Sequence, residues 1–516
     1  MRSWDLNKIS DVRAAQPPVH GRLTSERNIM LLGAVDLGSN SFRVEIGRVE
    51  GDRILTQSYW KETVRLAGGF DKNGALTPEI QARALAALAR FHERLAGLPA
   101  ARVRAVGTQA MRVATNAAEF LRKAEETLGY RIDILSGHEE ARLVFKGCAQ
   151  TLPRSERRRL VVDIGGASTE VIIGRGLDAE RYESFRIGCV NTSIRFFSDG
   201  RITQKSLERA TTACAAELEE SISAFGRGNF DEAFGSAGTF GAVSDICRTL
   251  GWSDGEVRPE HLEKLRKMLL DARDIENIRF AGLKEDRREV IAGGIAVLSA
   301  VYRVLGVESM RPASGALRMG LLYDLLGRVS NRDTRDLTIE TLMEASRLDR
   351  EQAARVADIT ETIYRRLKPE TDPEKLRYLR WAALVHEVGM IISSSRYHRH
   401  GHYIVMNADM PGFSRREQDM MAALVLSQRG TLKKMEPYFG ELISKEAAVA
   451  LRLAVIFAHA RTDVELPLMD FTRSEEGLRI RIEEGWLNAH PLTTYLLREE
   501  SEAWNKFGDR VTVEKF

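Results

Sequence analysis

Cysteine is scarce in this sequence, with only four among 516 residues, and no two of them have the C-x-x-C spacing of a metal or redox motif. All four lie in otherwise apolar segments and are predicted to be free thiols in a reducing cytoplasm: Cys148, Cys189, Cys214 and Cys247. No run approaches the roughly 20 apolar residues that a membrane helix needs. Residues 1–29 lack the continuous apolar core of a signal peptide, so we expect a flexible tail there and a cytoplasmic protein without membrane contact.

An excess of charge of one sign is also missing, because 76 basic side chains face 73 acidic ones and the net charge is +3. Any preference for a polyanion must therefore come from a local patch, and we expect no nucleic-acid partner. The 43% hydrophobic and 29% charged residues are typical of a soluble globular chain. Since a single core stops growing near roughly 250 to 300 residues, the length predicts several domains.

One stretch occurs twice. Residues 35–48 (VDLGSNSFRVEIGR) return 127 positions later as residues 162–175 (VDIGGASTEVIIGR), with 8 of the 14 positions identical. Each copy reads as an apolar strand, an aspartate, a glycine turn with polar side chains and a second strand, which together predict a β-hairpin. Glycine allows close backbone approach to a ligand, and successive N–H groups in such a turn can bind an anion.

Two such loops that face each other would hold a phosphate chain from both sides, although each alone could be an ordinary glycine turn. Asp36 and Asp163, at the strand ends, could hold a divalent cation above the chain. A third glycine-rich turn at Gly238 and Thr239 could be a further phosphate or nucleotide contact. The other candidate phosphate-binding residues are Gly38, Ser39, Asn40 and Ser41 in the first copy and Gly165, Gly166, Ala167, Ser168 and Thr169 in the second.

Two charged residues outside the repeat are candidates for chemistry. Arg112 follows a predicted strand near a helix start, where it could meet an anion, although spacing alone favours a solvated arginine. Ser136 and Glu139 fit the S-x-x-E capping box, so we expect Glu139 to cap the following helix reciprocally. Glu140 is then a spare carboxylate at a helix start, which the local pattern alone would leave on the surface.

Four motifs in order resemble the exopolyphosphatase/guanosine pentaphosphate phosphohydrolase family, a branch of the sugar kinase, heat-shock protein 70 and actin superfamily. They are residues 36–43 (DLGSNSFR), 107–112 (GTQAMR), 136–143 (SGHEEARL) and 163–170 (DIGGASTE). The resemblance implies that Glu140 activates water, that Arg112 contacts phosphate, and that the protein is a homodimer. Asp163 and Glu170 could then hold Mg²⁺ or Mn²⁺ through oxygen ligands. The chain departs from the family pattern at Ala167 and at Ser236 or Ala237, where the family more often has glycine.

The fold predicted from this resemblance is α/β, with two duplicated actin-like (ribonuclease H-like) lobes over 30–146 and 147–326. An all-α HD-like domain over 337–465 and a small α/β domain over 466–516 follow. Helical periodicity predicts segments near 340–347, 350–367, 373–392, 414–428 and 444–461, and charged residues over 327–336 predict a linker.

The predicted helical domain contains two notable clusters. His386 and Glu387 stand where a metal-dependent phosphohydrolase would have His-Asp, so the pattern indicates either a metal site or, preferably, a degenerate one. A basic cluster could form a track for a long polyanion or could be a solvated loop. Its members are His398, Arg399, His400, Lys433 and Lys434.

The leading functional hypothesis is an exopolyphosphatase that releases orthophosphate from the end of inorganic polyphosphate. The alternative is a guanosine pentaphosphate 5′-phosphohydrolase, which needs the same chemistry and a purine pocket. An actin-like nucleotide-binding or kinase scaffold and a binding-only sensor of polyphosphate or guanine alarmone are further possibilities. The sequence does not separate the two hydrolase substrates.

Overall fold

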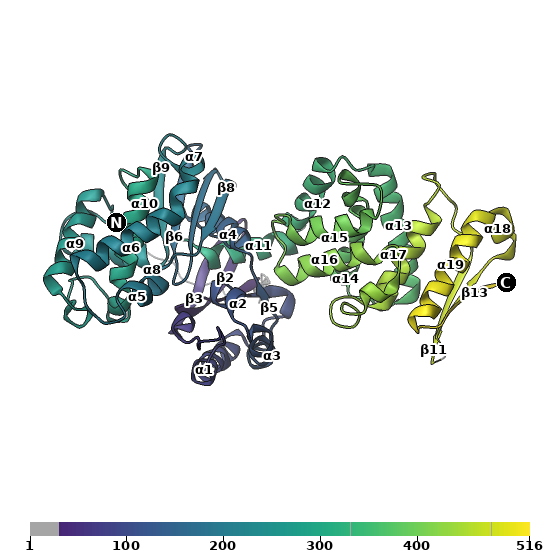
Figure 1. Cartoon of the computed structure of the whole chain (residues 1–516), viewed down its shortest axis with the longest axis horizontal. Coiled ribbons are helices and arrows are strands. Elements are labelled where there is room, and N and C mark those ends of the chain that lie inside the picture. Colours follow the sequence, from purple (N-terminus) through teal and green to yellow (C-terminus); the bar gives the residue numbers. More distant parts are fainter. Residues whose placement is uncertain (1–29, 331, 476) are drawn as a thin grey trace, which may run out of the picture.

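The computed structural model describes residues 30–330, 332–475 and 477–516, so the predicted tail over 1–29 lies outside the described chain. The molecule is elongated, with two sheet-containing lobes at one end, a helical region in the middle and a small sheet at the other end (Figure 1). Among the described residues, no helix is long and apolar enough to cross a membrane.

The first sheet has the strand order β3-β2-β1-β4-β5. Strands β1, β2 and β3 are successively antiparallel, whereas β1, β4 and β5 run parallel. Side-chain alternation along β1 places Val35 and Leu37 in the core beneath α1 and α3, and Leu32 and Ala34 on the opposite face. The bounds are β1 (Leu31–Leu37), β2 (Ser41–Glu50), β3 (Arg53–Thr63), β4 (Val103–Gly107), β5 (Ile132–Ile134), α1 (Pro78–Leu95), α2 (Gln109–Val113) and α3 (Ala117–Leu128).

The second sheet repeats this topology, with the order β10-β9-β6-β7-β8 and the same pattern of strand directions around its central strand β6. A register shift falls between Ile46 and Gly47 in one sheet and between Ile173 and Gly174 in the other, which is the offset of the sequence repeat. The bounds are β6 (Arg159–Ile164), β7 (Thr169–Arg175), β8 (Asp178–Phe185), β9 (Glu232–Ser236), β10 (Arg311–Pro312), α5 (Cys189–Phe196), α6 (Gln204–Leu218), α7 (Ile222–Phe225), α8 (Ala237–Thr249), α9 (Pro259–Ala272) and α10 (Ile291–Leu305).

Two helices, α4 (Gly137–Thr151) and α11 (Leu317–Val329), cross between the lobes. At Gly147 and at Gly320 the helices approach so closely that an added Cβ would overlap a backbone carbonyl across the crossing. α4 packs on β7 and β8 of the second sheet, whereas α11 lies against β1 and β4 of the first. The predicted lobe boundary at 146/147 falls inside α4, so the same helix that follows β5 also covers the second lobe.

The helices α12 to α17 lie between residues 334 and 457, and the small sheet β11-β12-β13 follows them. The predicted helix over 373–392 ends at Leu384, and the His-rich segment 397–407 forms a helix that lies outside the predicted segments. Apolar residues of both parts, such as Trp504 and Leu451, share one core. The bounds are α12 (Thr334–Ala345), α13 (Arg350–Leu367), α14 (Pro373–Leu384), α15 (Tyr397–Asn407), α16 (Arg415–Ser427), α17 (Lys445–Phe457), β11 (Met469–Ser474), β12 (Gly477–Ile482), α18 (Glu484–Ala489), α19 (Pro491–Phe507) and β13 (Val511–Lys515).

Buried ion pairs join the helical region to the lobes. Arg328 of α11 pairs with Asp324 at 3.2 Å and with Glu417 of α16 at 3.4 Å, and its Nη2 donates to the Gly412 carbonyl at 2.6 Å. Arg335 of α12 pairs with Glu417 at 2.8 Å. Because loss of one partner would leave another charge buried and unpaired, this network fixes the helical region against α11.

Candidate active site

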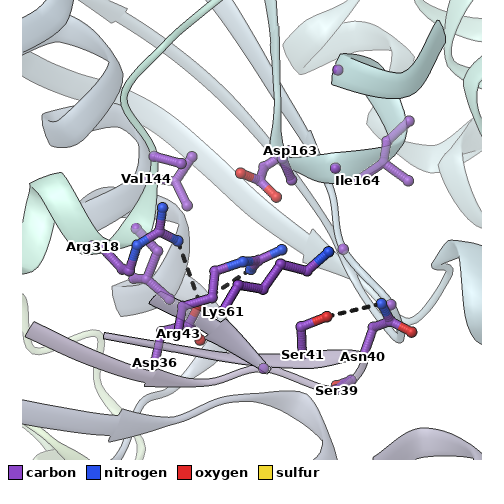
Figure 2. Close-up of a pocket in the computed structure, with 18 of the residues that line it drawn as sticks. Asp36, Ser39, Asn40, Ser41, Arg43, Lys61, Val144, Asp163, Ile164 and Arg318 are labelled. Carbon is purple, nitrogen blue, oxygen red and sulfur yellow. Dashed lines mark hydrogen bonds and ion pairs between the residues drawn. The ribbon is translucent and has the colours of Figure 1, made fainter. Parts of the chain in front are cut away.

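A cavity of about 340 Å³ lies between the two lobes and is lined by the β1–β2 turn of one and the β6–β7 turn of the other. Asp163 enters this space from the side opposite Asp36 and Ser41 (Figure 2). The two loops of the repeat therefore face the same space. The predicted phosphate-binding residues that line it are Asp36, Gly38, Ser39, Asn40, Ser41, Gly165, Gly166, Ser168 and Gly238.

The first glycine of each loop is required by a tight turn. A Cβ at Gly38 would lie 2.9 Å from the Ser41 carbonyl oxygen, and one at Gly165 would lie 3.1 Å from the Ser168 carbonyl oxygen. Both distances are shorter than ordinary van der Waals contact. The repeat in the sequence is thus a repeat of the turn geometry.

The two loops also touch each other, since a Cβ at Gly166 would lie 3.2 Å from the backbone nitrogen of Asn40. Carbonyl oxygens of both loops accept hydrogen bonds from neighbouring backbone N–H groups and do not face the cleft as free acceptors. Arg65 N donates to Asn40 O at 2.8 Å, and Val190 N donates to Gly166 O at 2.8 Å. Amide N–H groups are then the backbone groups that the loops can offer to an anion.

Three residues of the predicted phosphate set do not line the cavity. Ala167 does not adopt a positive φ, so alanine is accommodated where the family more often has glycine. Thr169 donates its hydroxyl to the Ile187 carbonyl at 2.6 Å. Thr239 is buried, and its hydroxyl has no hydrogen-bond partner within the described chain. Phosphate contact by these three side chains stays a prediction.

The turn into α8 carries a strained residue followed by a glycine that is needed for space. Ala237 has φ = 60°, in the left-handed region that favours glycine, which accounts for the glycine that the family more often has near this position. A Cβ at Gly238 would overlap the guanidinium of Arg287, which also lines the cavity. The turn therefore brings a buried arginine to the cleft.

Glu140 lies in the first turn of α4 and lines the cavity, although only 7% of its surface is exposed. Burial raises the pKa of its carboxyl to about 7, Arg112 opposes this, and the carboxylates of Asp36 and Asp163 add to it. A carboxyl with this pKa is poised to exchange a proton near neutral pH. The structure thus places the predicted water-activating residue in the cleft.

Arg112 stands behind Glu140 and is not among the residues that line the cavity. Its Nη1 donates to Glu140 Oε2 at 2.9 Å and to the Leu135 carbonyl at 2.8 Å, and its Nε donates to Gln109 at 2.9 Å. These bonds orient the Glu140 carboxylate. Direct contact between Arg112 and phosphate stays a prediction.

Glu139 differs from its expected capping role. Ser136 does accept the Glu139 backbone N–H at 3.1 Å, as the capping box predicts. The Glu139 carboxylate, however, accepts two hydrogen bonds from Arg142 at 2.7 and 2.8 Å and one from the backbone of Gly412 at 3.0 Å. The Glu139 side chain therefore anchors α4 to the helical region. It bonds to Arg142 and to the Gly412 N–H in preference to the amide at the start of α4.

The two predicted metal ligands occupy different places. Asp163 lines the cavity and accepts a hydrogen bond from Ser236 at 2.6 Å. Glu170 pairs with Asp163 in the β6–β7 ladder, does not line the cavity and accepts a hydrogen bond from Ser184 at 2.9 Å. Burial raises the pKa of both carboxyls, and for Glu170 the charges of Glu140 and Asp163 add to the effect.

Sequence reasoning missed most of the cations in the cleft. The cavity is also lined by Arg43, Lys61, Lys284, Arg287 and Arg318. Arg43 pairs with Asp36 in the β1–β2 ladder, at the place that Glu170 has beside Asp163 in the second lobe. Arg43 lies in the repeat and could have been singled out. Lys61, Lys284 and Arg287 carry no local signal because distant segments bring them to the cleft.

The helical region brings part of the predicted basic cluster together. His398 is buried, Arg399 is exposed and Lys434 is half-buried, and the Lys434 amine donates to the Arg429 carbonyl. Burial, helped by the charges of Arg452 and Arg399, lowers the pKa of Lys434 to about 7. Burial and Lys434 likewise lower the pKa of His398 to about 4. Such mutual repulsion suits an anion, but polyphosphate binding here stays a prediction.

At the expected HD-like position, Glu387 is held by an arginine. Arg461 donates to both Glu387 oxygens at 2.8 and 2.9 Å, and His386 Nδ1 lies 2.7 Å from the Ala383 carbonyl. Throughout residues 30–330, 332–475 and 477–516, no three His, Cys, Asp or Glu side chains approach closely enough to hold a metal by themselves. The HD-like assignment stays a prediction.

The two similar lobes bring both glycine turns and the buried Glu140 carboxyl to one cleft, an arrangement that suits a phosphoanhydride hydrolase. The model of the Ppx/GppA phosphatase family matches residues 48–329, and that of Ppx/GppA phosphatase, domain III, matches residues 334–501. The chain belongs to the Ppx/GppA phosphatase family.

Full-length relatives support this assignment, and a solved structure shares the fold. A guanosine-5′-triphosphate,3′-diphosphate pyrophosphatase of Aeromonas hydrophila is 36% identical over 490 residues, which cover 93% of this chain and 98% of the relative. The protein of that name in Pseudoalteromonas translucida is 35% identical over 502 residues, covering 96% of this chain and 100% of the relative. The crystal structure of an exopolyphosphatase from Cytophaga hutchinsonii is 24% identical, covers 58% of this chain and 98% of that chain, and superposes with a TM-score of 0.53, which shows the shared fold.

Proposed function

We propose that this enzyme hydrolyses the terminal phosphoanhydride of inorganic polyphosphate and releases orthophosphate. The observation that carries the proposal is the position of Glu140, a buried carboxyl in a cleft lined by both anion-binding loops. Hydrolysis of a phosphoanhydride needs a positioned water and stabilisation of the phosphoryl charge, and little covalent chemistry from the protein. In this cleft, Glu140 would position the water, and the loop amides and arginines would stabilise the charge.

In the proposed reaction, Glu140 accepts a proton from a water that attacks the terminal phosphorus. The bond between this phosphorus and the bridging oxygen breaks, and the shortened chain leaves with the bonding electrons. Arg112 holds the Glu140 carboxylate at 2.9 Å so that it faces the water. The loop amides together with Arg43 and Arg287 stabilise the charge of the phosphoryl oxygens.

A divalent cation, Mg²⁺ or Mn²⁺, fits the proposed site. Asp36 Oδ1 is buried and has no hydrogen-bond partner in the described chain, and Asp163 faces it across the cleft. Mg²⁺ commonly binds one or two carboxylates together with water and substrate phosphates, so these two aspartates would hold it together with water and the phosphate chain. When bound, the cation would neutralise charge on the phosphate chain, and Glu170 would support Asp163 from behind.

Guanosine pentaphosphate is the second candidate substrate. The full-length relatives at 35% to 36% identity carry names that specify it, whereas the exopolyphosphatase structure matches a smaller share of the chain. The same cleft would remove the terminal phosphate of its 5′-triphosphate. The cavity is also lined by Gly241, Ala242 and Gly282, whose small side chains would leave room for a nucleoside.

For polyphosphate, the basic cluster at His398, Arg399, His400, Lys433 and Lys434 would bind phosphates far from the reacting end. Replacing Lys433 and Lys434 by alanine should then raise KM for long chains and leave KM for guanosine pentaphosphate unchanged. Equal effects on both substrates would contradict this role. We also propose that the enzyme is a homodimer, which analytical sedimentation would test. The proposed domain boundaries are 146/147, 326/337 and 465/466.

The deciding experiment compares phosphate release with Mg²⁺ from long-chain polyphosphate, guanosine pentaphosphate and ATP at matched terminal-phosphate concentration. Loss of a general base costs about 10²- to 10⁴-fold in rate, so Glu140→Gln should lose turnover by this factor and still bind the substrate. Glu126→Gln, at an exposed position of α3, is the matched control. A Glu140→Gln enzyme with the wild-type rate would exclude Glu140 as the base.

A further inference from the structure

A second cavity, of about 300 Å³, adjoins the active-site cleft. The two cavities share four wall residues, which are Tyr59, Ser314, Ala316 and Arg318. We call the second one the back cavity; its remaining walls are Glu45, Thr56, Thr151, Gly315 and Met319. It therefore begins where α11 starts and runs along β2 and β3 of the first lobe.

Arg318 forms the partition between the cavities. Its Nε donates to Glu45 in the back cavity at 2.9 Å, its Nη1 lies 4.0 Å from Asp36 in the cleft, and its guanidinium stacks over Tyr59 at 4.9 Å. The 4.0 Å pair is longer than a hydrogen bond. The cation is thus held firmly on the back side and loosely on the side of the cleft.

Contacts between the lobes bridge the cleft away from Arg318. The two loops touch at Gly166 and Asn40, and two ion pairs connect the lobes, Lys61 with Asp286 and Arg65 with Glu289 at 2.7 Å. A substrate longer than one phosphate must extend from the reacting end along the remaining cleft. In the proposed reaction, orthophosphate would form beside Glu140, so the shortened chain would occupy the rest of the cleft and block that way out.

We propose that orthophosphate leaves through the back cavity and that Arg318 is the group that receives it there. This inference rests on the proposed hydrolysis in the cleft. Arg318 can turn from Asp36 toward the departing anion because only a 4.0 Å contact holds it there. Glu45 repels the anion little, because both of its carboxylate oxygens are already engaged. Arg318 neutralises one oxygen, and the Thr56 hydroxyl donates a hydrogen bond of 2.7 Å to the other.

The route explains how a bound chain could be shortened repeatedly. If orthophosphate left through the cleft, the chain would have to dissociate after each turnover. With a separate exit behind Arg318, the shortened chain can advance into the vacated position while its other phosphates stay bound. Product release through a constriction of this kind is a step that can limit turnover.

The test is a reversible block of the back cavity. Thr56 lines it, is exposed and does not line the cleft, and all four native cysteines are buried, so Thr56→Cys offers one reactive thiol for a bulky methanethiosulfonate reagent. Leu55→Cys is the matched control, because Leu55 is 43% exposed and precedes Thr56 on the opposite face of β3. Mass spectrometry gives the labelled fraction.

Two phosphate assays separate chemistry from release, with polyphosphate and with guanosine pentaphosphate. Acid quench counts all phosphate formed, and a fluorescent phosphate-binding sensor counts only what has left the enzyme. Labelled Thr56→Cys should form its first phosphate at the unlabelled rate and then turn over about tenfold or more slowly, with recovery after reduction. Labelled Leu55→Cys should be unaffected.

Unchanged steady-state turnover of the labelled Thr56→Cys enzyme would overturn the exit route. A first turnover that slows in parallel with the steady state would also overturn it, since the back cavity would then belong to the reaction chamber. If neither the wild type nor the unlabelled Thr56→Cys enzyme releases phosphate from any substrate, the result would instead contradict the proposed hydrolysis.

Discussion

Replacing Arg112 by methionine should move the pH dependence of turnover to higher pH. The wild-type carboxyl of Glu140 has a pKa of about 7, and Arg112 opposes burial through a hydrogen bond of 2.9 Å. An adjacent opposite charge lowers a carboxyl pKa by about 1 to 3 units, so its loss should raise this pKa to about 8 to 10. A general base acts deprotonated, so the active fraction at pH 7 falls from about one half to about one tenth or less.

The assay is the profile of kcat/KM between about pH 5 and about pH 10 for the wild type, Arg112→Met and Arg112→Lys. The rate should rise with pH in each enzyme, with the midpoint of Arg112→Met shifted upward by about 1 to 3 units. Arg112→Lys keeps the charge and should shift less. A lower plateau with an unchanged midpoint would refute the reasoning and would indicate that Arg112 contacts the phosphate directly.

Three further changes test the site. Folding raises the pKa of the Glu140 carboxyl from 4.5 to about 7, so its bound proton stabilises the folded state at low pH, and this stabilisation is lost as the pH rises from 4.5 to 7. Glutamine resembles the protonated carboxyl at every pH. In urea unfolding, Glu140→Gln should therefore be more stable than the wild type by up to about 3 kcal/mol above pH 7 and equally stable near pH 4. Ala237→Gly should raise the free energy of unfolding by about 0.5 to 1 kcal/mol, since relief of the left-handed strain exceeds the entropic cost of glycine. Gly238→Ala should raise KM about tenfold by displacing Arg287, and adding Arg287→Ala should cause little extra loss.

The parts of this fold that the sequence predicted are those in which the signal is local. The repeat at residues 35–48 and 162–175 specifies two hairpins because apolar alternation and a tight glycine turn occur within one stretch. Glu140 was identified by its family motif, and its burial in the cleft agrees with that reading. Such features need no knowledge of distant segments.

The parts that were missed depend on distant segments. Glu139 looked like a capping residue, yet its carboxylate binds the backbone of Gly412, which lies 273 residues away. Arg287 reaches the cleft only because Gly238 leaves space for it. Segment 397–407 is helical although three histidines and a glycine weaken its helix propensity, because packing against α16 decides its structure.

The ladder positions of Arg43 and Glu170 give the cleft a direction. The two lobes have the same topology, but the residue paired with the strand-end aspartate is a cation in the first lobe and a carboxyl in the second. A symmetric pair of lobes would bind a phosphate chain equally well in either orientation. Because Arg43 lines the cleft whereas Glu170 stands behind Asp163, the two sides of the cleft are not equivalent, and the two directions along a bound phosphate chain would differ in energy.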